Sequence, residues 1–232
     1  MLDAIFLYNY IKIMKTINEK IMLNNDYKFT INKKVNIPLK INQGIKKTET
    51  KTEVLNINNI KNPNYLYFLG GFVEGEGSNS VSISVNKNFK YGVNLQPVFN
   101  VSQHEKGLKI LYSFKELFRV GSVVEKSGSP HVWVYTLKGY KQIIEHVIPF
   151  LEKYVQPFSC KKEEFNLFLT LVLKSASGHQ KNKDTLIEMV KLAYTLQGKG
   201  KVRKRTLDEV LEIIKDKTTY FNNVKSNENF YS

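Results

Sequence analysis

The chain has 232 residues, and its 35 lysine and arginine residues against 21 acidic ones give a formal net charge of +14 at neutral pH. That length is enough for one medium domain with an appendage, and the positive charge predicts a polyanionic partner, with nucleic acid favoured over a merely solvated basic surface. The single cysteine, Cys160, excludes an internal disulfide and a thiolate zinc cluster and favours a reducing compartment.

The amino-terminal region lacks the pattern of a folded domain. From residue 15 to residue 63 it is rich in lysine, asparagine, threonine and isoleucine, without a sustained hydrophobic period. We therefore predict a poorly ordered basic arm over residues 1–62, able to contact phosphates without specificity. Asp3 and Lys12 argue against a secretory signal in the apolar opening segment, which leaves an exon relic or an organellar leader. No apolar run is long enough for a membrane span, so no membrane partner is expected.

The stretch that organises the chain is an apolar run, Tyr65 to Val73, that ends on two glutamates, Glu74 and Glu76. Gly70 and Gly71 lie inside the predicted helix, where each costs roughly 1 kcal/mol relative to alanine, so a close contact between two helix backbones is expected. The helix dipole disfavours carboxylates at its C-terminal end, which predicts a compensating cation. Carboxylate and carbonyl oxygens suit magnesium, whereas a core helix closed by a glycine-rich turn is the alternative.

Two alternating runs follow, over residues 78–86 and 93–102, and predict a hairpin of half-buried strands. Valine, isoleucine, leucine and phenylalanine occupy one face. The other face is predicted to carry Ser80, Ser82, Ser84, Asn86, Asn94, Gln96 and Asn100. Hydroxyls and amides both donate and accept hydrogen bonds, so these residues are candidates for base readout in a DNA major groove. An ordinary wetted sheet face is the alternative.

A second helix-and-strand-pair unit is predicted next, followed by helical spacing. The helical ranges are 105–118, 140–148 and 150–154, and the strand ranges are 121–126 and 132–137. The order of elements predicts an α+β fold with an αββαββα core. Lys126, His131, Trp133 and Tyr135 are candidates for the outward face of the second strand pair, and the first three are predicted to bind DNA. A lone tryptophan often belongs to the core instead.

The C-terminal third predicts further helices. A lysine pair, Lys161 and Lys162, begins one of them, although the helix dipole disfavours cations there, which suggests either a function or a solvated surface. Helices are then predicted over 184–196 and, with a capping box, over 206–215. In the loop between them Lys199 and Lys201 are candidates for phosphate contacts, with a solvated loop as the alternative. The domain is predicted to cover residues 63–217, with a disordered tail over 218–232.

The letters LGGFVEGEG at Leu69–Gly77 resemble the nine-letter motif of the LAGLIDADG homing endonucleases, with glutamates in place of both aspartates. The resemblance extends over roughly residues 65–215. It implies a motif helix packed against its symmetry mate and a last acid that binds the catalytic metal, here Glu76, with the Gly75 carbonyl as a further ligand.

The resemblance also assigns two other catalytic positions. Gln103 matches the polar residue that orders water at the metals, and Lys162 matches the lysine that faces the scissile phosphate. The family usually has a basic residue four positions after Gln103, but this chain has Gly107 there. Lys106 or His104 is left as a substitute.

One copy of the motif per chain implies a homodimer, since a single acid cannot cut both strands. The expected dimer face is Leu69, Gly70, Gly71 and Val73, with a closed, isologous contact. The implied activity is cleavage of double-stranded DNA at a long, near-palindromic site with Mg²⁺, for which Mn²⁺ would substitute. The alternatives are an RNA maturase that binds a group I intron and a non-catalytic DNA-binding regulator. The codon-biased composition suits an organelle, with the mitochondrion favoured over the chloroplast.

Overall fold

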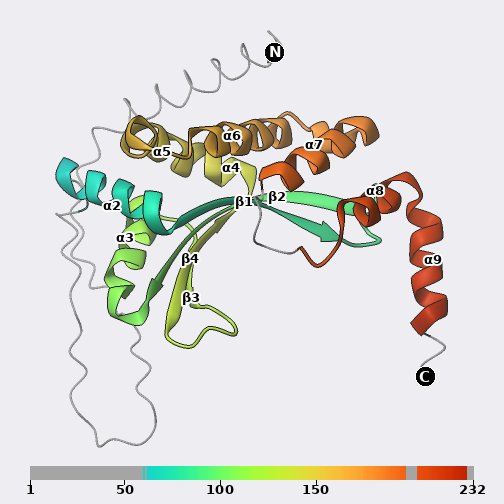
Figure 1. Ribbon diagram of the computed structural model, residues 1–232, viewed down its shortest axis with the longest axis horizontal. Coiled ribbons are helices and arrows are strands. Elements are labelled where there is room, and N and C mark those ends of the chain that lie inside the picture. Colours follow the sequence, from blue (N-terminus) through green and yellow to red (C-terminus); the bar gives the residue numbers. More distant parts are fainter. Residues whose placement is uncertain (1–59, 61, 197–202, 229–232) are drawn as a thin grey trace, which may run out of the picture. The chain divides into compact units, whose positions relative to one another are not determined.

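The computed structural model describes residue 60, residues 62–196 and residues 203–228 (Figure 1). The predicted basic arm therefore falls outside the described residues, apart from Ile60 and Asn62. The loop candidates Lys199 and Lys201 fall outside them as well.

The elements follow the order expected from the two hydrophobic periods. The helices are α2 (Pro63–Glu76), α3 (Leu108–Phe118), α4 (Tyr140–Gln142), α5 (Ile148–Tyr154), α6 (Lys162–Ala176), α7 (Lys183–Leu196), α8 (Leu207–Lys215) and α9 (Lys217–Glu228). The strands are β1 (Gly77–Val85), β2 (Val93–His104), β3 (Ser122–Glu125) and β4 (Val132–Lys138). Short helical turns are η3 (Glu105–Gly107), η4 (Ile143–Val147), η5 (Gln156–Phe158) and η6 (His179–Lys181), of which η4 is π-helical.

Local signals at the element ends explain these boundaries. Asn62 caps α2 by accepting a hydrogen bond from the Asn64 backbone N–H at 2.9 Å, and Pro63 occupies the first helical position. The predicted capping box is present in α8, where Thr206 and Glu209 bond each other's backbone N–H groups.

The four strands form one antiparallel sheet in the order β1-β2-β4-β3. In β1 and β2, Gly77 lies opposite Val101 and Val85 lies opposite Val93, while β4 pairs with β2 only from Val98 onward. Figure 1 shows α5, α6 and α7 along one side of this sheet, and α3 also contacts β2, β3 and β4. The arrangement confirms the predicted α+β fold with an αββαββα core and C-terminal helices.

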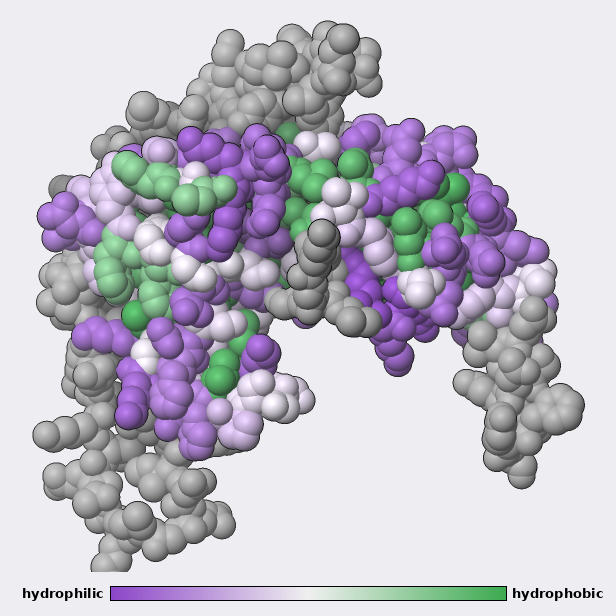
Figure 2. Space-filling view, viewed as in Figure 1, coloured by the Kyte–Doolittle hydropathy of each residue, from purple (hydrophilic) through white to green (hydrophobic). Residues whose placement is uncertain are grey.

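Figure 2 shows hydrophilic residues over most of the described surface in that view. On the sheet, the register places Ser82 opposite Gln96 and Ser84 opposite Asn94. The predicted alternation in β1 and β2 is therefore confirmed. None of the helices in this part of the chain combines the length and apolar character needed to cross a bilayer.

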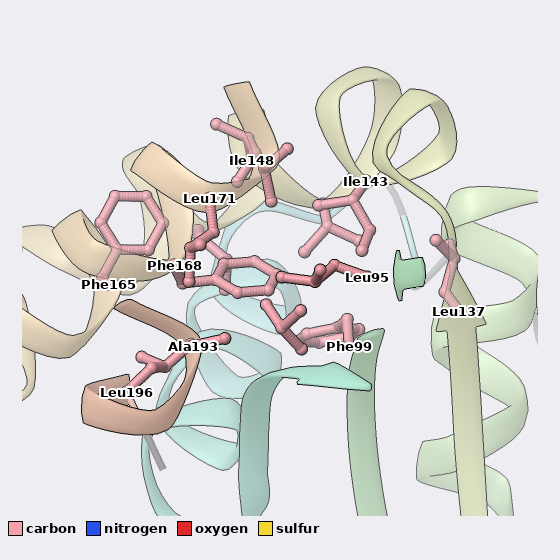
Figure 3. Packing of buried hydrophobic residues seen from close by; sticks show 14 of the residues in the cluster. Leu95, Phe99, Leu137, Ile143, Ile148, Phe165, Phe168, Leu171, Ala193 and Leu196 are labelled. Carbon is pink, nitrogen blue, oxygen red and sulfur yellow. The ribbon is translucent and has the colours of Figure 1, made fainter. Parts of the chain in front are cut away.

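The covered face of the sheet supplies the core. Figure 3 shows Leu95 and Phe99 of β2 directed toward Phe168 and Leu171 of α6 and toward Ile143 of η4. These side chains are at most 2% exposed, and full burial of each contributes about 1.5–3 kcal/mol. This packing fixes which face of the hairpin points away from the helices.

Two sequence-based expectations are wrong. Trp133 and Tyr135 do not face outward: Tyr135 is fully buried, and Trp133 lies on the same face and packs against the core.

The segment from residue 218, predicted to be a disordered tail, begins as helix α9. The Asp216 carboxylate accepts hydrogen bonds from the Thr219 side chain and, at 3.0 Å, from the Thr219 backbone N–H, and these bonds lower the pKa of Asp216. Tyr220 and Phe221 pack against the core.

Candidate active site and nucleic-acid interface

The acidic end of α2 runs into β1 without a loop. Gly77 is the C-cap of α2 and the first residue of β1, and its N–H donates to the Val73 carbonyl. A Cβ at this position would lie 2.7 Å from Val73 Cγ1, so the junction requires glycine. Gly75 and Glu76, the predicted metal ligands, are both exposed at this helix end.

Glu74 and Lys161 tie the end of α2 to the start of α6. Glu74 Oε1 accepts a hydrogen bond from the Cys160 backbone N–H at 3.1 Å, and Lys161 Nζ donates to the Glu74 carbonyl oxygen at 2.6 Å. Glu74 therefore anchors the end of α2 to its neighbours. The ammonium group also supplies positive charge at the negative end of the helix dipole.

The two lysines of the pair lie in different surroundings. Lys161 contacts α2, whereas Lys162 is exposed at the first position of α6. Glu76 lies two residues beyond Glu74, and Lys162 lies one residue beyond Lys161. The contact between Glu74 and Lys161 consequently couples the two segments that carry Glu76 and Lys162.

Gln103 lies at the end of β2, two residues beyond Val101, the partner of Gly77. Its Oε1 accepts a hydrogen bond from the His104 backbone N–H at 2.7 Å. A Cβ on Gly107 would lie 2.9 Å from Gln103 Cδ, so the Gln103 side chain covers the position where the family usually has a basic residue. A larger residue at 107 would displace Gln103, which gives a physical reason for the glycine.

The two suggested substitutes for that basic residue lie in the turn after β2. His104 Nδ1 accepts a hydrogen bond from the Lys106 backbone N–H at 3.2 Å, so His104 caps η3, and the Lys106 side chain is exposed. His131 Nδ1 lies 3.1 Å from Glu105 Oε2, and this hydrogen bond lowers the pKa of Glu105. His131 therefore sits in an exposed turn, stacked on His104, rather than on the sheet face.

The hairpin face predicted to read DNA is assembled as expected. Ser82, Ser84 and Gln96 are exposed, whereas Ser80, Asn94 and Asn100 are half-buried. Asn86 is exposed in the hairpin turn, where its Oδ1 accepts a hydrogen bond from the Asn88 backbone N–H at 2.9 Å.

In β4 the residues on the polar face alternate with Trp133 and Tyr135 and do not coincide with them. The register places Thr136 opposite Asn100 and Lys138 opposite Val98, on the polar face. Because neighbouring strand residues point to opposite faces, this places Trp133 on the core side. If the alternation of polar and apolar residues in β2 is extended to the neighbouring strand β4, it predicts that Thr136 and Lys138 lie on the polar face.

Two hollows connect these groups. One of about 590 Å³ joins the end of α2, the sheet and the start of α6, and its lining includes Glu74, Ser78, Ser102, Lys126, Lys161 and Glu164. The other, of about 450 Å³, lies over the sheet beside the C-terminal segment, and its lining includes Ser82, Thr136, Lys138, Arg203, Lys204 and Arg205. Within the described residues, the acceptors Asn79 Oδ1 and Asn100 Oδ1 are buried without a hydrogen-bond partner, and both residues line the first of these hollows.

Arg203 anchors the basic C-terminal segment to the edge of the sheet. Its Nη2 donates to the Val81 carbonyl at 3.2 Å and to the Ala193 carbonyl at 2.9 Å, and its guanidinium lies 4.6 Å from the centre of the Tyr194 ring. Burial lowers the pKa of Arg203. The outer edge of β1 is thereby covered, and the exposed Lys204 lies beside the second hollow.

The structure corrects three of the four residues expected at a dimer face. Leu69, Gly70 and Val73 are buried within the chain, and a Cβ on Gly70 would lie 2.9 Å from the Tyr154 carbonyl carbon. The close helix contact predicted for the glycine pair is therefore made with α5 of the same chain. Gly71 is exposed, and a Cβ there would have no other atom within 4 Å.

The donor groups fit a hard divalent cation only as part of a larger site. Among the described residues no group of three or more histidine, cysteine, aspartate or glutamate side chains is placed to hold a metal ion. The exposed Glu76 carboxylate and the adjacent Gly75 carbonyl are oxygen donors of the type that magnesium prefers. One chain therefore contributes part of a coordination sphere, which further oxygens must complete.

Comparisons with known proteins agree with this geometry. The family model for "LAGLIDADG endonuclease" matches residues 69–172. The DNA endonuclease I-CeuI of Chlamydomonas moewusii is 40% identical over 116 residues, which cover 49% of this chain and 53% of that protein. The homing endonuclease I-ApeII of Aeropyrum pernix is 28% identical over 151 residues, covering 63% and 88% respectively.

Among solved structures, the archaeal intron-encoded homing endonuclease I-Vdi141I complexed with DNA aligns with a TM-score of 0.60 and 34% identity. The alignment covers 66% of this chain and 95% of that one. The match to I-CeuI, by contrast, spans only about half the length of that relative. On the motif, the fold and these matches, the chain belongs to the LAGLIDADG endonuclease family.

Proposed function

We propose that the chain is a site-specific homing endonuclease that cuts both strands of a long, near-palindromic DNA site as a homodimer. The observation that carries the proposal is the position of Glu76, exposed at the end of a helix that continues directly into the polar strand of the sheet. The relatives I-CeuI and I-ApeII are named as endonucleases, and I-Vdi141I was solved with DNA, which supports this assignment. A mitochondrial location is part of the proposal and rests on composition alone.

The DNA would lie along the polar face of the sheet. Ser82 and Gln96 are exposed there and Thr136 is half-buried on the same face, and their hydroxyl and amide groups are of the kind that read base edges in a major groove. Lys138 and Lys204 lie beside these residues and would contact phosphates, which position the protein without reading sequence. Lys126, at the first hollow, would extend these contacts toward the acidic end of α2.

The dimer would form through the exposed side of α2. Tyr67 and Phe68 are 46% and 50% exposed, and Phe158 beside them is 71% exposed. Gly71 lies on the open side of the same helix, where a second helix backbone can approach closely. Aromatic side chains are enriched at interface cores, and an isologous contact of this face brings two Glu76 residues to one axis.

A divalent metal, with magnesium proposed and manganese as a substitute, would supply charge stabilisation and an activated water when it is bound by Glu76 and Gly75. The chain's own residues have separate tasks. Lys162 would neutralise negative charge on the scissile phosphate, and Gln103 would orient water through its amide. The bonds from Glu74 to Cys160 and Lys161 would hold α2 and α6 in the required relation.

The test replaces Glu76 by glutamine and measures cleavage of a randomised duplex DNA library in Mg²⁺, together with DNA binding. We expect cleavage to fall by at least about a hundredfold while binding persists, because the change removes a ligand charge and little volume. Glu145→Gln, at an exposed glutamate in η4, is the matched control and should cut normally. Equal cutting by Glu76→Gln refutes the proposal. A wild-type chain that never cuts DNA but supports intron splicing identifies a maturase.

A further inference from the structure

The far end of the β1–β2 hairpin extends beyond the rest of the sheet. Because β4 pairs with β2 only from Val98 to His104, residues 93–97 of β2 have β1 as their strand neighbour on one side alone. Two-stranded ribbons are marginally stable and twist strongly by themselves. This end of the hairpin nevertheless carries Ser82, Ser84, Asn94 and Gln96 of the proposed DNA-reading face.

Gln180, in η6 between α6 and α7, takes the place of the missing strand. Its Oε1 accepts a hydrogen bond from the Leu95 backbone N–H at 3.0 Å, and its Nε2 donates to the Leu95 carbonyl at 3.0 Å. A primary amide carries a donor and an acceptor side by side, so it can satisfy both backbone groups of one strand residue. Gln180 Nε2 also lies 3.2 Å from the buried Ser175 hydroxyl, which fixes the side chain on α6.

The hairpin turn is held by three further hydrogen bonds. The Lys181 carbonyl accepts hydrogen bonds from Lys90 Nζ at 3.0 Å and from the Tyr91 hydroxyl at 3.3 Å. From the C-terminal side, Lys217 Nζ donates to the Phe89 carbonyl at 2.8 Å. Gln180 is thus the side chain that holds the strand itself, while the other contacts hold the turn.

The position of Gln180 bears directly on two of the proposed base-reading residues. Leu95 lies between Asn94 and Gln96, whose side chains point to the opposite face of the sheet. Any movement of the Leu95 backbone would therefore move the side-chain amides of Asn94 and Gln96 relative to the major groove of the bound DNA. Hydrogen bonds to base edges require donor–acceptor distances within a few tenths of an ångström, so such movement weakens discrimination.

We propose that Gln180 is a specificity-determining positioning residue, which fixes the register of Asn94 and Gln96 on the outer part of each DNA half-site. The inference rests on the proposed function. Gln180 lies at the edge of β2 that β4 leaves unpaired, where it is bonded to backbone, and it acts on the DNA only through β2.

The experiment compares wild type with Gln180→Met, which keeps the side-chain length and loses both hydrogen bonds, and Gln180→Glu, which keeps the acceptor and loses the donor. Each protein is assayed for cleavage of a library in which every base pair of the wild-type site is varied singly. We expect discrimination to fall about five- to tenfold at the few positions read by Asn94 and Gln96, with the central positions unchanged. Amide exchange of Leu95 should accelerate in Gln180→Met, which loses the acceptor of the Leu95 N–H.

Tyr135→Phe is the control for a general loss of stability, because it removes one core hydrogen bond, from the Tyr135 hydroxyl to the Val120 carbonyl at 2.8 Å, far from η6 in the chain. It should leave the base profile unchanged. An unchanged profile in both Gln180 variants, or a uniform loss at all positions, overturns the inference while leaving the nuclease assignment intact. Absence of any site selection by the wild type refutes the nuclease assignment, and the inference falls with it.

Discussion

The two adjacent glycines of α2 should respond to alanine with opposite signs, and this pair tests the packing of the motif helix. At Gly70 a Cβ would lie 2.9 Å from the Tyr154 carbonyl carbon and 3.1 Å from its Cβ. The obstructing carbonyl belongs to backbone, so α2 and α5 must separate. Overpacking of this kind costs about 1–3 kcal/mol, and a backbone obstacle places Gly70→Ala near the upper end.

Helix propensity partly offsets that cost. Alanine is better than glycine inside a helix by about 1 kcal/mol, so the net loss for Gly70→Ala is about 2 kcal/mol. For a domain of this size, that corresponds to a fall in Tm of about 4–8 °C. At Gly71 the added methyl group meets open space, so Gly71→Ala should gain about 1 kcal/mol within one subunit.

Thermal unfolding and sedimentation, both over a range of protein concentrations, separate the two effects. At the lowest concentration, where subunits are apart, Gly71→Ala should raise Tm and Gly70→Ala should lower it. At higher concentration Gly71→Ala should dimerise more weakly than wild type, because the methyl group separates the proposed helix pair. If both variants lower subunit stability equally, or if Gly71→Ala dimerises normally, the assignment of one glycine to each contact is wrong.

Three further predictions concern the two lysines at the start of α6, the residues of β4 that face the core, and the pH dependence of stability. In a single-turnover assay, Lys162→Met should lower the cleavage rate by about a hundredfold, with DNA binding retained. In the same assay Lys161→Met, which loses an exposed contact to Glu74, should lower the rate by less than about fivefold. Trp133→Ala should cost about 3 kcal/mol in denaturant unfolding, whereas Thr136→Ala should change stability by less than about 0.5 kcal/mol and weaken DNA binding. Burial lowers the pKa of His146 below its ordinary value. As the pH falls below about 6.5, the unfolded chain therefore takes up a proton at His146 before the folded chain does, and the free energy of unfolding declines. His146→Gln should flatten this acid-side loss in denaturant unfolding, and an unchanged slope would exclude His146 as its source.

The spacing of apolar residues along the sequence was sufficient to predict the order of the elements and the two faces of the β1–β2 hairpin. In β1 the serines occupy every second position, so the phase of the strand is unambiguous. In β4 the sequence VWVYTLK offers apolar residues on both faces, and the phase depends on which ones pack against α3. Only tertiary packing decides that Tyr135 is buried.

The dimer face predicted from the sequence is wrong at Leu69, Gly70 and Val73 for a related reason. A glycine pair inside a helix predicts a close helix contact, but the sequence does not state which partner helix fills it. The structure assigns Gly70 to α5 and leaves Gly71 open, although the two residues are adjacent. Neighbouring positions in a helix point about 100° apart, so two close contacts can occur side by side on one helix.

The junction at Gly77 explains why the proposed catalytic and DNA-reading parts of the chain depend on each other. Gly77 ends α2 and begins β1, so the number of residues between Glu76 and each serine of the reading face is fixed without an adjustable loop. A shift of β1 by one residue against β2 would turn Ser82 and Ser84 toward the core and move Glu76 along β2 relative to Gln103. The burial of Val81 opposes such a shift. The packing energy of the core is thus also what sets the distance from the proposed cutting site to the bases that the sheet would read.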